Sequence, residues 1–147
     1  MGKIFEELFV ELQADMIDIC LEYVEERADI IYIYCSFEQN ALTNNFFYRI
    51  NDMLVKKHKL NDAAKNGKNY DVSIDRQQLV VKEINKDIEK INALCREHNK
   101  PMPTEMKIIY DVRRKNMETE YLYDCVYSNA EDKSAMMICD EWFNSLI

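Results

Sequence analysis

The stretch that decides the fold runs from Asp75 to Ser128 and reads DRQQLVVKEINKDIEKINALCREHNKPMPTEMKIIYDVRRKNMETEYLYDCVYS. Its first half repeats residues every three or four positions, as one buried face of an α-helix does: Val81, Ile84, Ile88, Ile91, Cys95 and His98. Asp75 and Gln78 have the spacing of a capping box, so we predict that a long helix begins here. Pro101 and Pro103 end it, because proline lacks a backbone N–H and biases its predecessor toward extended geometry.

Two alternating runs, residues 106–113 and 120–127, follow the prolines and predict a β-hairpin. A turn over residues 115–118 places Arg113 opposite Glu120 on the exposed face. The same register gathers eight residues on the opposite face: Met106, Ile108, Tyr110, Val112, Tyr121, Tyr123, Cys125 and Tyr127. A slip by one residue would mix the two faces, so the pattern favours this register.

The remaining chain divides into segments with clear periodicity. We predict a helix over residues 3–26, a strand over 28–38, a turn over 39–44, a second strand over 45–56 and a closing helix over 129–146. Ser128 and Glu131 have capping-box spacing before the last helix, and Trp142, the sole tryptophan, is expected to anchor the core.

Residues 57–74 form the one long loop in this interpretation. The loop is basic, and Asn66-Gly67 indicates a turn within it. It has no glycine-rich phosphate-binding pattern, so we expect a mobile, solvated segment.

The predicted order is α-β-β-α-β-β-α within a single domain over residues 1–147. Two antiparallel hairpins most simply form one four-stranded antiparallel sheet, and the amphipathic helices must cover it. The fold class predicted from the sequence is therefore α+β.

The net charge of −8 is unevenly distributed along the chain. Residues 1–40 carry ten acidic and two basic side chains, residues 41–115 carry ten and sixteen, and residues 116–147 carry seven and one. Direct nucleic-acid binding is disfavoured, because it needs a basic face that displaces counterions. Acidic surfaces at the two ends of the chain instead suit a basic protein partner.

The first predicted helix carries a second stripe, of acids, that projects from one exposed face: Glu7, Glu11, Asp15, Asp18 and Glu22. Like charges at this spacing cost a few tenths of a kcal/mol each, so a helix selected for stability alone would intersperse lysines. One interpretation is a solvated helix face, which charge runs usually form. The other is a partner-binding surface for a cationic protein, and these five residues are the candidate site.

The sequence predicts no catalytic, cofactor-binding or metal site. No nucleophile elbow, zinc-protease motif, P-loop or dinucleotide fingerprint occurs, and the five cysteines have no CxxC spacing. Cys20, Cys35, Cys95, Cys125 and Cys139 each lie in an apolar segment, which favours reduced, buried thiols. No apolar run reaches the roughly 20 residues that span a bilayer, and acids follow the first residues, so we expect a cytoplasmic protein without membrane contact.

The layout resembles that of the YezG-like bacterial immunity proteins. The resemblance is carried by the acidic amphipathic first helix, the strand around Tyr32-Ile33-Tyr34, the aromatic strand Phe46-Phe47-Tyr48, the helix ending Leu94-Cys95-Arg96-Glu97, the proline break and the hairpin ending Tyr121-Leu122-Tyr123-Asp124. Two family features differ: Met102 and Thr104 follow the prolines where the family tends to have tryptophan, and Asn116-Met117 stands where it tends to have glycine.

The resemblance implies an antitoxin that binds and neutralises a cognate polymorphic toxin, often a nuclease, without catalysis. A basic toxin domain would be its partner, and no cofactor is implied. Two other interpretations remain open from the residues: a non-catalytic adaptor or regulatory module that binds another basic protein, and a small enzyme whose site the sequence does not reveal.

Overall fold

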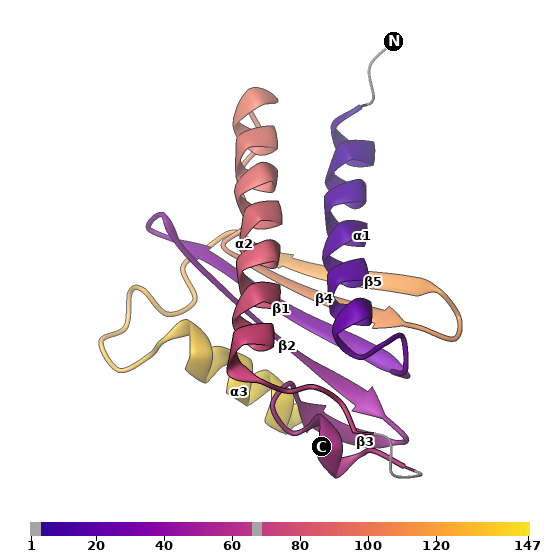
Figure 1. Ribbon diagram of the computed structural model, residues 1–147. Helices are drawn as coiled ribbons and strands as arrows, with labels where there is room; N and C mark the ends of the chain where they lie inside the picture. Colours follow the sequence, from indigo (N-terminus) through magenta and orange to yellow (C-terminus); the bar gives the residue numbers. More distant parts are fainter. Residues whose placement is uncertain (1–3, 66–68) are drawn as a thin grey trace.

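The computed structural model describes residues 4–65 and 69–147, and in these ranges it is an α+β fold built on one antiparallel sheet (Figure 1). The elements, in chain order, are α1 (Phe5–Tyr23), β1 (Ile30–Glu38), β2 (Ala41–Ile50), β3 (Met53–Lys56), the short 3-10 helix η1 (Leu60–Asp62), α2 (Ile74–Glu97), β4 (Glu105–Asp111), β5 (Asn116–Leu122) and α3 (Ala135–Ser145). The α+β class is confirmed.

The described sheet has five strands in the order β3-β2-β1-β4-β5, so the predicted four-stranded sheet is wrong in detail. The extra strand arises because the predicted strand over residues 45–56 folds back on itself. Asn51 and Asp52 both have positive φ, at 51° and 66°, which is the geometry of a two-residue hairpin turn. The preceding turn is equally tight, with Gln39 and Asn40 at 52° and 63° rather than a loop over residues 39–44.

Helices α1 and α2 lie side by side and antiparallel on one face of the sheet, and α3 lies on the other (Figure 1). The main core fills the space between these two helices and the sheet, and one cluster of buried side chains joins Met16, Cys20, Ile84, Ile88 and the sheet residue Ile33. The α2 face is confirmed at Ile84, Ile88, Ile91 and Cys95, while His98 is exposed. The helix is capped by Ser73, which accepts from the Arg76 N–H, and not by Asp75.

A second, smaller core lies under α3. Tyr32, Tyr34 and Phe47 point to this side of the sheet and pack against Ile138 and Trp142. Strand β1 is therefore buried on both faces, which explains its unbroken run of apolar and aromatic residues. Trp142 makes edge contacts with Tyr32 and Phe47 at ring-centroid distances of 5.8 and 5.1 Å, so its role as a core anchor is confirmed.

The hairpin of β4 and β5 forms in a different register from the predicted one. Glu120 lies opposite Lys107, not Arg113, and the last pair before the turn is Asp111 with Asn116. The turn is set by Asp111, whose side chain accepts from the Arg114 N–H at 3.0 Å, and by Lys115, whose φ is +54°. The chain from Tyr123 to Tyr127 is consequently not a strand.

Two other predicted segments also differ. Within residues 57–74, Leu60, Ala63 and Tyr70 are buried, so the described part of this segment is packed against the core and not a solvated loop. The predicted turn at Asn66-Gly67 lies outside the described residues. The closing helix begins after its cap Ser134, six residues later than predicted.

Candidate functional site

The five predicted contact residues all lie on the exposed side of α1. Glu7, Glu11, Asp15, Asp18 and Glu22 are each exposed, while the opposite side of the helix is buried through residues such as Phe9, Met16 and Cys20. The structure therefore brings the row together on one surface, which we call the acidic face. Its function as a contact surface stays a prediction.

Asp15 is the member of the row that meets α2. Its carboxyl neighbours that of Asp87, a buried residue of α2. The pKa of Asp87 is raised to about 7, mainly by burial, with the neighbouring Asp15 adding to the rise and Lys90 opposing it. Asp87, the buried neighbour of this position, therefore changes its protonation near neutral pH.

The acidic face ends in a hollow at the C-terminus of α1, with a volume of about 550 Å³. Its lining is mainly acidic: Asp18, Leu21, Glu22, Glu25, Glu26 and Arg76. The chain reverses here because Glu25 and Glu26 both have positive φ, and the Glu26 N–H donates back to the Leu21 carbonyl at 2.8 Å.

Arg76 is the cation that borders this hollow. Its guanidinium donates to the backbone carbonyls of Glu22 and Tyr23 at 3.1 and 3.2 Å. These hydrogen bonds give partners to carbonyl groups at the C-terminal end of α1, not to a carboxylate. Glu25 forms an ion pair with Arg27 at 2.8 Å. No basic residue lies in the last turn of α1, so the partial negative charge of the helix end adds to that of the acids. Such a hollow suits the cationic side chain of a protein partner.

Sequence reasoning found the row but not the hollow. Glu25 and Glu26 lie in the acid-rich first forty residues, and this composition is the one sequence feature that points to the hollow. Arg76 comes from α2, and its position beside the end of α1 depends on how the two helices pack.

A second group of acids lies near the C-terminus. Glu131 and Asp132 are exposed in the segment before α3, and Glu141 is exposed on α3. Asp140 forms an ion pair with Lys56 of β3 at 3.3 Å, so its charge is partly compensated.

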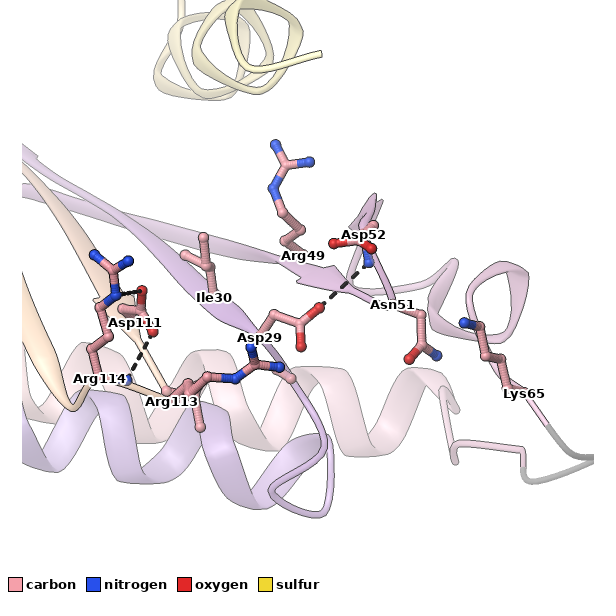
Figure 2. A pocket seen from close by; sticks show the side chains of 11 residues that line it. Asp29, Ile30, Arg49, Asn51, Asp52, Lys65, Asp111, Arg113 and Arg114 are labelled. Atoms are coloured by element: carbon pink, nitrogen blue, oxygen red, sulfur yellow. Dashed lines mark hydrogen bonds and ion pairs between the residues drawn. The ribbon is translucent and has the colours of Figure 1, made fainter.

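A polar pocket of about 690 Å³ lies where β1 begins and β2 and β4 end (Figure 2). Its charged lining mixes both signs: Asp29, Arg49, Asp52, Lys65, Asp111, Arg113 and Arg114. Figure 2 shows Arg49 pointing toward α3, while Lys65 and Arg114 lie at opposite ends of the pocket. Arg114 is bound to Asp111 of its own turn, and Arg49 donates to the Leu146 carbonyl at 3.2 Å. Arg49, Lys65 and Arg114 thus lie in different parts of this region (Figure 2).

His58 and Cys139 both line another small pocket, of about 240 Å³. Burial raises the pKa of Cys139 to about 11, so its thiol is protonated at neutral pH and a poor nucleophile. Cys20, Cys35 and Cys95 are also buried, whereas Cys125 is exposed, contrary to the expectation of five buried thiols. All five cysteines are free of disulfides.

Residues 4–65 and 69–147 contain no group of three or more His, Cys, Asp or Glu side chains arranged to hold a metal ion. None of the helices in these ranges is long and apolar enough to cross a membrane.

No protein-family model matches the chain, and no curated protein matches its sequence. The resemblance to YezG-like immunity proteins therefore remains a prediction from the residues quoted above.

Proposed function

We propose that this protein is an immunity protein that binds a cognate toxin domain, such as a nuclease, through a basic surface of the toxin and blocks it without catalysis. The observation that carries the proposal is the acidic face of α1, in which all five carboxylates are exposed and lead into the acidic hollow.

The physical basis is electrostatic complementarity. A nuclease attracts a phosphate backbone through basic residues, so an acidic protein is steered to the same surface and covers it. The hollow gives a lysine or arginine of the toxin a place to insert, against the carboxylates of Asp18, Glu22 and Glu26. The net charge of −8 adds a long-range attraction to a basic partner.

The test is a double charge reversal, Glu7→Lys with Asp18→Lys, measured against the protein encoded by the neighbouring gene. Both residues are exposed, so each change should alter the free energy of unfolding by no more than about 0.5 kcal/mol. Association should slow by about tenfold or more, and its dependence on salt should weaken, because charges at the rim of an interface act mainly on the on-rate.

The matched control is Glu131→Lys with Asp132→Lys, which changes the net charge by the same amount on another exposed segment. Equal slowing by both pairs would mean that only net charge matters. If neither pair changes binding or protection of cells, the acidic face is a solvated helix face and the proposed contact is wrong.

The second candidate is a non-catalytic adaptor that binds another basic protein, and the same acidic face supports it. Co-expression distinguishes the two. An immunity protein restores growth of cells that express the neighbouring toxin gene and binds its product at about nanomolar strength or tighter. An adaptor does neither, but it retains a basic partner that the charge reversal releases.

A further inference from the structure

Among the residues that the structure describes, no strand pairs with the outer edge of β5. β5 is the last strand of the sheet, and its extensive backbone contacts within the described chain are with β4. Figure 1 shows it at the margin of the sheet on the side away from α3. The opposite margin, β3, spans only Met53–Lys56 and offers a much shorter edge.

The hydrogen-bond pattern shows which β5 residues face outward. The Val112 N–H donates to the Asp29 carbonyl at 3.0 Å, so even-numbered residues of this run bond to β1. The odd-numbered residues of β4 then bond to β5, where their partners are Asn116, Glu118, Glu120 and Leu122. Backbone groups alternate in direction along a strand, so the N–H and C=O groups of Met117, Thr119 and Tyr121 point away from the sheet. They are free to pair with an added strand.

We infer that the outer edge of β5 is a strand-pairing site for an extended segment of a basic protein partner, in which lysine or arginine alternates with apolar residues. This surface is separate from the acidic face of α1. The inference goes beyond the proposed function, and testing it requires no toxin.

The requirement for basic residues comes from Glu118 and Glu120. Both are exposed and lie on the face of the sheet away from α1 and α2. Glu118 lies opposite the apolar Ile109, and Lys107, which lies opposite Glu120, contacts the buried Glu105 at 3.9 Å. In an added strand, the positions facing these two glutamates are non-hydrogen-bonded pairs, in which side chains approach most closely. Cationic side chains there would be favoured.

The requirement for apolar residues comes from the other face. Met117 packs against the main core, and Tyr121 meets α1 through an edge contact with Phe9 and a hydrogen bond from Gln13 Nε2 at 2.8 Å. Beside Tyr121 lies a mainly apolar hollow of about 270 Å³, lined by Phe5, Glu6, Phe9, Val10, Lys100, Pro101, Tyr121 and Tyr123. A side chain of the added strand at this end can fill it.

A second copy of the chain is a poor occupant. Antiparallel pairing of two β5 edges through Met117, Thr119 and Tyr121 puts Glu118 opposite Glu120 twice when the axis passes through Thr119. A shift by two residues either way places one glutamate opposite itself. Like charges directly opposite each other are destabilising, so the edge discriminates against its own copy and in favour of a basic segment.

The experiment uses a short acetylated peptide in which lysine alternates with valine, added to the full chain and followed by amide hydrogen exchange. The Met117, Thr119 and Tyr121 amides should exchange at least about tenfold more slowly, because they gain hydrogen-bond partners. A peptide of the same sequence with alternate N-methylated amides is the control. It keeps its charge but cannot complete the ladder, and it should give no protection.

The variant Glu118→Lys with Glu120→Lys should weaken peptide binding by about tenfold, since two cross-strand ion pairs become repulsive. Glu89→Lys with Glu97→Lys, on the exposed face of α2, changes the net charge equally and should leave binding within about twofold.

Three outcomes would overturn the inference. They are absence of protection at the three amides at millimolar peptide, equal binding of the N-methylated peptide, and concentration-dependent protection of the same amides without peptide. The last would identify a second copy as the occupant. Loss of toxin binding by the α1 variants with retained peptide pairing would leave this inference standing on its own.

Discussion

Asp87 is a buried carboxyl that meets mostly acidic neighbours. Its pKa is raised to about 7, chiefly by burial; the neighbouring Asp15 and then Glu83 add to the rise, and Lys90 opposes it. Its Oδ2 atom has no hydrogen-bond partner among the described residues. The protonated form is therefore the one that the fold prefers.

The sign of the pH dependence follows. Between about pH 4 and pH 7 the folded protein keeps a proton on Asp87 that the unfolded chain releases, so the free energy of unfolding falls as pH rises through this window. Asp87→Asn should remove this pH dependence. The variant should therefore gain more free energy of unfolding, relative to the unmutated protein, at pH 8 than at pH 5. Urea unfolding at about pH 5 and pH 8 measures it, with Glu89→Gln on exposed α2 as control. An unchanged slope in Asp87→Asn would contradict the assignment.

Glu38 has the opposite behaviour, although it too is buried. Burial alone would raise its pKa, but hydrogen bonds from Ser128 and from the Val126 N–H outweigh it and hold the pKa below its ordinary value. Its contribution is present above the ordinary glutamate pKa and is lost as pH falls through the folded pKa. Glu38→Ala leaves two amides unpaired and should cost about 1–3 kcal/mol.

Amide exchange separates this role from general destabilisation. In Glu38→Ala the Val126 and Ser128 amides should exchange faster than the rest of the chain, because the carboxylate ties the segment after β5 to the end of β1. Glu120→Ala, at an exposed position on β5, is the control and should leave both amides unchanged. Uniform acceleration everywhere would mean that Glu38 acts only through global stability.

At the scale of elements, periodicity located all three helices and the faces of the hairpin strands, but not the hairpin register. The predicted register differs from the observed one by six residues, since Glu120 pairs with Lys107 and not Arg113. Six is an even number, so Met106, Ile108 and Tyr121 keep the predicted face. Alternation of apolar and polar residues determines only which face each side chain takes. The residues that pair across the hairpin are set by the turn at Asp111.

Tertiary contacts overrode two other local signals. Ser128 has capping-box spacing, but its backbone N–H donates to Glu38 and it does not start a helix. The segment before α2 folds because Asn61 bonds to both backbone groups of Tyr70, whose ring lies under Arg27 at 4.1 Å. The residues in each of these contacts are not neighbours in the sequence, so local sequence patterns cannot predict them.

The turn between β2 and β3 should tolerate, and gain from, a glycine. Asp52 has a φ of +66°, a conformation that costs a residue with a Cβ about 1 kcal/mol. Asp52→Gly creates an Asn-Gly pair, the preferred sequence for this turn, and should raise stability by about 0.5–1 kcal/mol. Asp52→Ala, which keeps the Cβ and loses the local polar group, should lower it. Urea midpoints of the two variants, moving in opposite directions, would check the turn.

At the scale of the whole molecule, the acidic face was predictable because helical spacing and charge are both written in the sequence. The hollow at the end of α1 was not, because it depends on Arg76 of α2 and on the reversal at Glu25 and Glu26. The open edge of β5 depends on the strand order, which placed β1 in the centre of the sheet. The spacing of charges can be read from neighbouring residues, whereas the hollow and the strand edge depend on how the whole chain folds.

The two cores should also respond separately to mutation. Ile138 packs under α3 in the smaller core, and Ile88 lies in the main core under α2. Ile138→Ala should cost about 2–4 kcal/mol and speed amide exchange mainly in α3, while Ile88→Ala should speed exchange throughout. Exchange measured by mass spectrometry on peptic fragments distinguishes local from global opening. Equal acceleration of α2 in Ile138→Ala would mean that the molecule opens as one unit.

Trp142 lies in the smaller core, so intrinsic fluorescence can be used to follow that core. As the sole tryptophan, it is 9% exposed and touches Tyr32 and Phe47, so its emission reports the docking of α3 and nothing on the opposite face of the sheet. Far-ultraviolet circular dichroism, in contrast, is dominated by α1 and α2. On heating, a red shift of the emission that precedes the loss of ellipticity would show α3 leaving first, and coincident curves would show a single cooperative transition. Tryptophan emission thus reports on the layer that contains α3.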